Sequence, residues 1–341
     1  MMVKLLSSVA AMLLTTQIHA ESAVAPTPSY MMPLAEKAVL TDLIRVNDQL
    51  YVAVGDRGHL LVSKNSTSWT QIQTPVQSLF TSVYFSDDKH GWAVGHDATI
   101  IATQDGGQSW QLQQFKPETD KPLFDILFAD ATNGIALGAY GMFYRTTDGG
   151  KTWQDEFHLE LVGGEDQEYL KELQETDPDA YLEERASVLP HFNRIYQHSN
   201  VLYLIGEAGF FATSADFGKS WTRHTEFYNG SLFGLTMTAQ NSLIAAGLRG
   251  HVFRSTDLGQ SWQEVKLNHT ATLNSVLTDE AGRVYLTGNA GTLLVSQDDG
   301  VSFTSMPTPD SKAILNAVAV RDQLVLVTEA GIRTLAIKKP E

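Results

Sequence analysis

Carboxylates recur along this chain in a fixed local context that would suit acid catalysis or metal binding. The string Asp-x-Gly-x-Ser/Thr-Trp stands at 105–110 and 148–153, and related strings follow at 216–221, 257–262 and 298–303. Successive Asp residues are 43, 68, 41 and 41 positions apart. Catalysis does not need five copies of one carboxylate, whereas a repeat of this length is typical of one supersecondary unit used many times. The pattern therefore favours structure over chemistry.

In this structural interpretation, each Asp accepts backbone N–H bonds in a tight turn, and each Trp covers the gap between neighbouring units. The Gly supplies a backbone conformation that other residues resist. The residues assigned to this structural role are Asp105, Asp148, Asp216, Asp257, Asp298, Trp110, Trp153, Trp221 and Trp262.

Short β-favouring runs must position these turns. Upstream of each Asp, two apolar runs flank a Gly-containing turn, a further apolar run precedes them, and the Trp begins a fourth. Four strands in about 41 residues match one β-propeller blade. A degenerate unit with Asn65 in place of Asp comes first, and a partial unit covers 314–337. We predict an all-β, seven-bladed propeller over 21–341, with 30–36 supplying the last blade's missing strand.

The one irregular step marks an insertion at about 159–189, between blades 3 and 4. Apolar spacing predicts helices over 165–176 and 179–188, separated by Asp177-Pro178. Residues 155–190 hold twelve acidic residues against two basic ones, which accounts for −10 of the chain's net charge of −15. Such a block is either a solvated face or a docking element for a basic partner. Its candidate binding residues are Glu168, Glu172, Glu183 and Glu184.

The turns that join second and third strands lie opposite the Asp turns and vary in sequence from blade to blade. Variable residues on a repeated scaffold are where function is normally carried. They are either ordinary turn and channel residues or a mixed-charge recognition face. The candidate partner-binding residues here are Arg57, His96, Tyr140, Glu207 and Arg249, with Arg194 from an inner strand.

Composition excludes several other functions. The acidic balance, 39 Asp and Glu against 24 Lys and Arg, argues against nucleic acid as a partner. The scattered histidines show no metal-ligand spacing, so no metal or other cofactor is expected.

The segment 1–20 has a basic start, a short apolar core and a small residue at Ala20, which is typical of a cleaved secretory signal. With no Cys for lipid attachment, we expect an exported, soluble periplasmic monomer.

The repeats resemble the Asp-box, or BNR repeat, with the fullest matches at 103–110, 146–153, 214–221 and 255–262. Together with Gly-Trp-Ala-Val-Gly at 91–95, the chain is similar to the photosystem II stability/assembly factor family, in particular its exported branch from non-photosynthetic bacteria. Genes of that branch often lie near exporters of the resistance-nodulation-division class. The resemblance implies a non-catalytic assembly role with a protein partner, such as a transporter or other membrane complex, and membrane association only through that partner.

Two rival functions remain, a glycoside hydrolase of the sialidase type and a carbohydrate-binding propeller. A sialidase is expected to use three arginines, a Tyr–Glu pair and an Asp acid. Arg57, Arg194 and Arg249 with Tyr140, Glu207 and Asp97 are the residues that would have to converge. The Arg-Ile-Pro motif expected before the first box is absent.

Overall fold

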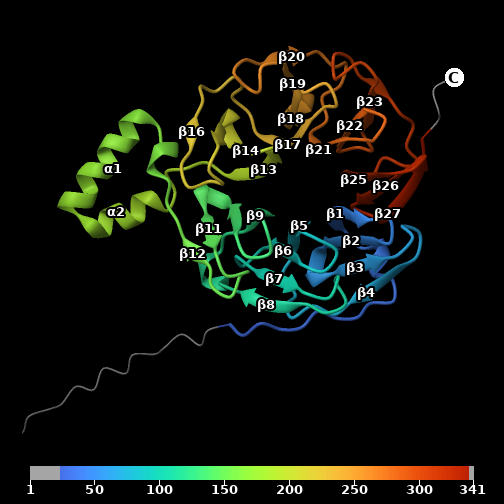
Figure 1. Ribbon diagram of the computed structural model, residues 1–341, viewed down its shortest axis with the longest axis horizontal. Coiled ribbons are helices and arrows are strands. Elements are labelled where there is room, and N and C mark those ends of the chain that lie inside the picture. Colours follow the sequence, from blue (N-terminus) through green and yellow to red (C-terminus); the bar gives the residue numbers. More distant parts are fainter. Residues whose placement is uncertain (1–23, 338–341) are drawn as a thin grey trace, which may run out of the picture.

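The computed structural model describes residues 24–337, and its strands form seven antiparallel sheets around a central axis (Figure 1). This arrangement confirms the predicted seven-bladed β-propeller. The predicted signal peptide, at 1–20, lies outside the described residues. No helix in the described part of the chain is long and apolar enough to cross a membrane.

Each blade is built from consecutive residues, and its strands follow one another from the axis outward. The strands are, in blade 1, β1 (Leu40–Asn47), β2 (Leu50–Gly55), β3 (Leu60–Ser63) and β4 (Trp69–Ile72); in blade 2, β5 (Phe80–Phe85), β6 (Gly91–Gly95), β7 (Ile100–Thr103) and β8 (Gln111–Gln114); in blade 3, β9 (Leu123–Phe128), β10 (Gly134–Gly138), β11 (Phe143–Thr146) and β12 (Gln154–Asp155); in blade 4, β13 (Phe192–His198), β14 (Val201–Gly206), β15 (Phe211–Ser214) and β16 (Thr222–Arg223); in blade 5, β17 (Leu232–Met237), β18 (Leu243–Gly247), β19 (Val252–Ser255) and β20 (Gln263–Val265); in blade 6, β21 (Leu273–Thr278), β22 (Val284–Gly288), β23 (Leu293–Ser296) and β24 (Thr304–Ser305); and in blade 7, β25 (Ile314–Val320), β26 (Gln323–Thr328) and β27 (Gly331–Ala336).

Blade 7 has three strands in the described structure, so the prediction that 30–36 completes it is wrong. The N-terminal segment instead follows the outer edge of blade 1, where Ser29 N–H donates to the Thr74 carbonyl over 3.0 Å. The side chain of Gln71 holds the next residues of this segment. Its amide nitrogen donates to the Tyr30 carbonyl, and its amide oxygen accepts the Met32 N–H. Prolines at 26, 28 and 33 cannot donate to a strand ladder, which disfavours the predicted strand.

Hydrophobic clusters fill every interface between neighbouring blades. Within residues 24–337 there are seven such clusters, each formed by two successive blades, with blades 7 and 1 sharing the one that closes the ring. Alternation along the strands explains this arrangement, because successive side chains point to opposite faces of a blade. Both faces are covered, so strands such as β6 and β10 are buried along their whole length.

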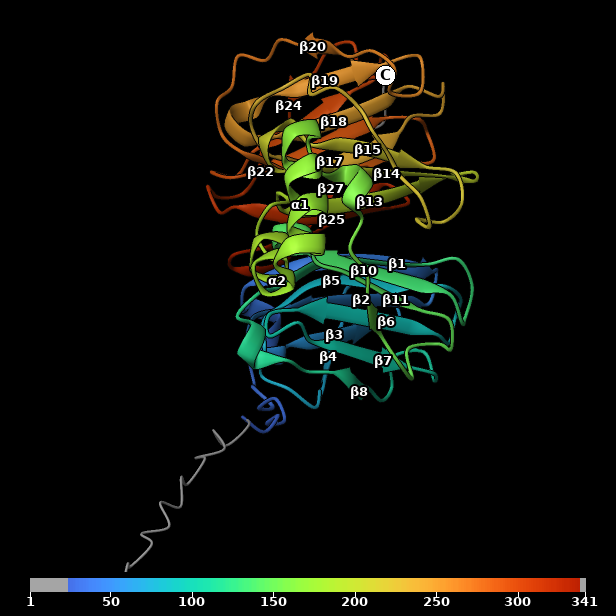
Figure 2. The ribbon, with the colours of Figure 1, turned by 90° about the vertical axis from the view of Figure 1, so that its left-hand side faces the viewer.

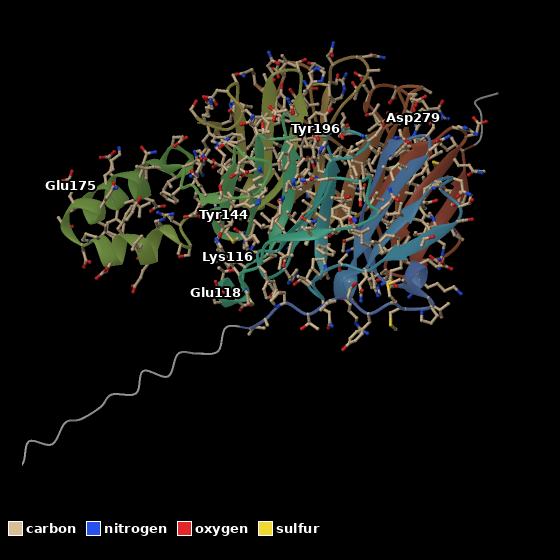
Figure 3. The ribbon with its side chains drawn as sticks, turned by 60° about the horizontal axis from the view of Figure 1, so that its bottom comes forward. Lys116, Glu118, Tyr144, Glu175, Tyr196 and Asp279 are labelled. Carbon is tan, nitrogen blue, oxygen red and sulfur yellow. The ribbon has the colours of Figure 1, made fainter. Side chains whose placement is uncertain are left out.

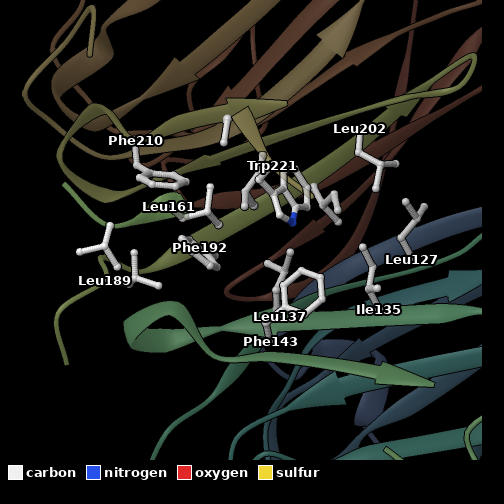
Figure 4. Packing of buried hydrophobic residues seen from close by; sticks show 14 of the residues in the cluster. Leu127, Ile135, Leu137, Phe143, Leu161, Leu189, Phe192, Leu202, Phe210 and Trp221 are labelled. Atoms are coloured by element: carbon white, nitrogen blue, oxygen red, sulfur yellow. The ribbon is translucent and has the colours of Figure 1, made fainter. Parts of the chain in front are cut away.

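The predicted insertion is present between blades 3 and 4 as helices α1 (Gly164–Thr176) and α2 (Pro178–Arg185). The side chain of Asp177 accepts the Ala180 N–H over 3.1 Å, which caps α2 at the predicted break. Figure 2 shows the helix pair against the side of the propeller. Leu161, Leu170 and Leu189 join the cluster between blades 3 and 4, part of which Figure 4 shows with Phe143. The insertion therefore shares the propeller's core.

Strand alternation divides the loops between two faces of the ring. Links between first and second strands, and the Asp boxes, lie at one end, which we call the Asp-box face. Links between second and third strands, and those between blades, lie at the other end, which we call the turn face. The insertion is a link between blades and belongs to the turn face.

Candidate functional site

The Asp-box carboxylates are used within their own turns. Asp105 Oδ1 accepts the Ser109 N–H at 2.9 Å and the Thr103 hydroxyl at 2.8 Å, and Oδ2 accepts the Ser109 hydroxyl at 2.6 Å. The same set of bonds recurs in the four later boxes, at Asp148, Asp216, Asp257 and Asp298. Hydrogen bonds from the following Ser or Thr lower the pKa of Asp148, Asp216 and Asp257 to about 2. These groups stay ionised at neutral pH, because the bonds favour the charged form.

The Asp-box tryptophans pack between blades. Trp110 belongs to the cluster of blades 1 and 2, Trp153 to that of blades 2 and 3, and Trp221 and Trp262 to the next two interfaces. Trp110 is 7% exposed and meets Phe85 edge-on, with ring centroids 6.0 Å apart. Each Trp therefore packs its own blade against the preceding one.

A polar ring surrounds the central channel at one register position of the inner strands. Six of the seven blades place a polar side chain there, namely Asp42, Ser82, Asp125, Arg194, Ser275 and Asn316, and blade 5 has Gly234 at this position. The ring members bond across blade boundaries. Asp42 accepts the Val83 N–H, Asp125 accepts the Ile195 N–H, and Asn316 donates to Asp42 across the closure of the ring.

The predicted candidate Arg194 is committed to this ring. Its guanidinium lies 3.4 Å from a carboxylate oxygen of Asp125, which also accepts the Ser82 hydroxyl at 2.8 Å. Burial raises the pKa of Asp125, while the Arg194 charge and the hydrogen bonds act in the opposite direction. The pair joins blades 3 and 4, and the Arg194 side chain, which is 26% exposed, also lines the central channel, so its role in binding a partner stays a prediction.

Turn-face candidates come from several blades. Arg57 and Arg249 occupy the same left-handed position of their turns, with φ of 53° and 57°, and both are exposed. Arg57 lies 3.4 Å from Asp56. His96 is also exposed and holds its turn through its backbone N–H, which donates to the Leu79 carbonyl at 2.9 Å.

Tyr140 and Glu207 are brought together by a residue that the sequence did not single out as a binding residue. The Tyr140 N–H donates to His191 Nδ1 over 3.0 Å, and the two ring centroids are 4.5 Å apart. Glu207 flanks the same histidine, because its backbone N–H donates to the His191 carbonyl at 3.0 Å. The Tyr140 side chain is 46% exposed. His191 thus joins the turns of blades 3 and 4 into one surface.

Beside Tyr140 a groove of about 550 Å³ runs between blade 3 and α2. We call it the blade 3 groove. Lys116, Lys121 and Arg185 supply its cations, and each lies over a ring, Tyr144 at 4.4 Å, Tyr140 at 5.1 Å and Phe157 at 5.0 Å respectively. Figure 3 shows Lys116 beside Tyr144. Sequence reasoning missed these cations because they belong to no repeated motif and because Arg185 is 64 positions beyond Lys121.

The acidic candidates of the insertion lie on exposed helical positions. Glu168 pairs with Lys171 at 2.8 Å, and Glu172, Glu183 and Glu184 are exposed on α1 and α2. Their role in binding a basic partner stays a prediction. Among the described residues, no group of three or more His, Cys, Asp or Glu side chains is arranged to hold a metal ion.

The residues that a sialidase would need are not assembled in the described structure. Arg194 lines the channel, whereas Arg249 lines a different hollow beside Tyr228. Arg57 lines neither of them. Asp97 accepts the hydroxyl of Ser78, from the link between blades 1 and 2, at 2.5 Å. Arg194 and Arg249 therefore line separate hollows of the described structure, and Arg57 lines neither of these two.

Comparisons with known proteins agree with this geometry. Residues 61–121 match the family described as "Photosynthesis system II assembly factor YCF48", and residues 144–155 match the BNR/Asp-box repeat. The chain is 36% identical over 72 residues to the chloroplastic photosystem II stability/assembly factor HCF136 of Guillardia theta, and 34% identical over 62 residues to the photosystem II assembly protein Ycf48 of Thermosynechococcus vestitus. These matches cover 20% and 18% of this chain, and 18% of each relative.

Solved structures extend the likeness to the whole fold. A structure titled "YCF48 bound to D1 peptide" has a TM-score of 0.67 at 20% identity, and the match covers 93% of this chain and 100% of that one. YCF48 from Cyanidioschyzon merolae has a TM-score of 0.66 at 16% identity, over 92% and 99% of the two chains. This chain is therefore a seven-bladed propeller with BNR repeats, similar to YCF48 and HCF136 over short stretches of sequence and to YCF48 in its whole fold.

Proposed function

We propose that this protein is a non-catalytic accessory or assembly factor, which binds a protein partner through its turn face. One observation carries the proposal. The Asp-box carboxylates and the channel carboxylates Asp42 and Asp125 are held by internal hydrogen bonds, so the repeated acidic groups are not free for chemistry. The turn face, in contrast, exposes Tyr140, Arg57 and Arg249 from three different blades.

The comparisons support a peptide or protein as the ligand. YCF48, a propeller of the same architecture, has been solved with a bound D1 peptide, and the sequence relatives are named as assembly factors of photosystem II. The matches to those relatives are short, and the acidic insertion has no counterpart in the repeat pattern. We therefore carry over the kind of ligand, a protein segment, and not the photosystem itself.

We further propose an exported protein of the cell envelope that acts beside a membrane complex, such as an exporter of the resistance-nodulation-division class. The support is the signal-like sequence at 1–20 and the likeness to the exported, non-photosynthetic branch of assembly factors. In this proposal the protein reaches the membrane only through its partner.

Site-specific photo-crosslinking in cells that produce the protein tests the proposal. A photoreactive phenylalanine replaces Tyr140 on the turn face, and in a matched variant it replaces Leu258 in an Asp box. The two native side chains have similar exposed fractions, 46% and 50%, so exposure does not bias the comparison. We expect one membrane protein to be cross-linked from position 140 and not from 258. Equal cross-linking from both positions, or none from 140, would overturn the assignment of the turn face.

The catalytic alternative has its own test. Purified protein is assayed with a panel of aryl glycosides, beside the variants Tyr140→Phe and Glu207→Gln. We expect no turnover by any of the three proteins. Turnover by the unmodified protein that either substitution abolishes would replace the assembly function with glycoside hydrolysis. Binding on a glycan array without cross-linking to a protein would favour the carbohydrate-binding propeller.

A further inference from the structure

The geometry points to the blade 3 groove as a docking site for an extended peptide segment in which acidic side chains flank a large apolar one. This inference rests on the proposed function and gives the partner's contact segment a definite chemistry. The sequence drew attention to the acidic outer surface of the insertion, and therefore to a basic partner. The groove at the base of the insertion has the opposite charge.

Two lysines in the groove lack an acidic partner. Lys116 donates to the Tyr144 hydroxyl over 3.3 Å, and Lys121 donates to the Ala186 carbonyl over 2.5 Å. No carboxylate oxygen of the described chain lies within 4.0 Å of either ammonium, although the protein carries 39 acidic residues. An ammonium group has three donors, so each lysine retains donors for a ligand.

The other charged groups of the groove are already paired. Arg185 lies 2.7 Å from Asp155, and Glu156 lies 2.7 Å from Arg145. The unpaired charge of the lining is therefore the two lysines, and it is positive. An incoming carboxylate would meet two cations held in place by aromatic rings, so less side-chain entropy is lost on binding than with freely moving lysines.

The remaining lining favours a peptide over a small free anion. Leu182 and Tyr140 are 56% and 46% exposed, and Met142 and Phe157, which are half-buried, belong to the same lining. An apolar side chain placed here would cover surfaces that are now open to water. The volume of about 550 Å³ lies within the usual range for specific ligand sites, about 300–1,000 Å³.

The floor and wall of the groove are built to keep their positions. The Gly141 N–H donates to the Pro190 carbonyl at 2.9 Å, which ties blade 3 to the end of the insertion. A Cβ on Gly141 would lie 2.5 Å from the Leu189 side chain, and φ there is 69°. Glycine is therefore required for this close approach. The opposite wall is held by the bond from Lys121 to the Ala186 carbonyl, just after α2, and by the Arg185–Asp155 pair.

Fluorescence polarisation with labelled decapeptides tests the inference on the intact propeller. The probes have a central Phe-Leu pair flanked by Asp and Glu, by Asn and Gln, or by Lys. We expect the acidic probe to bind at least tenfold more tightly than the neutral probe and to weaken as salt is raised, because exposed charges are screened. Amidation of the probe's C-terminus should leave its affinity unchanged, because the side chains are the proposed contacts.

Variants locate the binding. Lys116→Gln with Lys121→Gln removes both charges but retains a donor for the Ala186 carbonyl, and we expect at least tenfold weaker binding of the acidic probe. Lys151→Gln with Lys219→Gln changes the net charge equally on exposed positions of the Asp-box face, and we expect no change. The charge reversal Lys116→Glu with Lys121→Glu should bind the Lys probe more tightly than the unmodified protein does, a gain that misfolding would not produce.

The outcomes separate this inference from the proposed function. If all probes bind equally, or if the Lys151/Lys219 control weakens binding as much, the groove is not an acidic-peptide site. If the photoreactive phenylalanine at position 140 still cross-links the partner after Lys116→Gln and Lys121→Gln, the proposed function stands. The groove is then refuted as the contact of that partner. Absence of any cross-linked partner in the unmodified protein would overturn the proposed function instead.

Discussion

Substitution of Leu170 by Ala should release the helical insertion while the propeller stays folded. Within α1 and α2, which the structure describes in full, Leu170 is the only buried side chain, with 1% exposure. It is part of the cluster between blades 3 and 4, together with Leu161, Val162 and Leu189. The helices themselves are too short and too acidic to persist alone in water. Leu170 is therefore the main apolar contact of the two helices, beside the partly buried Tyr181 and the Arg185–Asp155 pair.

The expected change in the opening free energy follows from the complete burial of the Leu170 side chain. Replacing a fully buried Leu by Ala costs about 2 to 4 kcal/mol, because transfer energy is lost and a cavity remains. Every 1.36 kcal/mol is a tenfold change in an equilibrium constant, so local opening of the insertion becomes roughly 30- to 1,000-fold more frequent. The blade strands keep their own contacts, and their opening free energies should change far less.

Amide hydrogen exchange of residues 164–185 measures this directly. We expect exchange in α1 and α2 of the Leu170→Ala variant to accelerate by that factor, while the buried strands β10 and β14 retain their protection. Leu182→Ala is the matched control, because Leu182 lies on α2 and is 56% exposed. If exchange accelerates equally in the strands, or equally in the control, the insertion is not a separately opening unit held by Leu170.

Three further predictions concern the repeats and the channel. Asp148→Asn should make the loss of stability on acidification less steep. The Asp148 carboxylate, with a pKa of about 2, stabilises the fold above its unfolded pKa near 4 and loses that effect as pH falls through 2. Circular dichroism against pH measures the acid transition, and an unchanged transition would contradict this prediction. Gly209→Ala should lower the stability by at least about 2 kcal/mol in urea denaturation, because φ is 73° and the new Cβ would lie 1.6 Å from the Tyr228 carbonyl oxygen; a shift within about 0.5 kcal/mol would refute it. Asp125→Ala should cost about 3 to 5 kcal/mol by leaving Arg194 uncompensated, and adding Arg194→Met should recover much of that loss; a double variant no more stable than Asp125→Ala would disprove the coupling.

The repeat made most of the fold predictable. The five Asp boxes set the register of blades 2 to 6, and the 68-residue step located the insertion before its helices were seen. The last blade's closure was not predictable, because the hydrogen bonds that place 29–32 come from the Gln71 side chain and the Thr74 carbonyl. Neither residue belongs to a repeated pattern.

The candidate site was predictable only where it follows the repeat. The turn positions of Tyr140 and Arg249 could be located by alignment of the blades with one another. Arg194 shows the limit of such alignment, since its partner Asp125 lies 69 positions away on another blade. The blade 3 groove shows the same limit, because Lys116 and Lys121 lie in the link between blades 2 and 3 whereas Arg185 ends α2. Only the three-dimensional packing of the insertion brings them together.

The closure of the ring has a consequence for how the protein folds. Six of the seven blade interfaces join neighbours in the sequence, whereas Asn316 and Asp42 meet across 274 positions. Bringing such distant residues together carries the largest loop entropy, so the junction of blades 7 and 1 should form last. Until then the chain is an open arc whose two end blades expose the apolar side chains of the closing cluster. That arc is the species most prone to self-association, and rapid closure protects the protein against it.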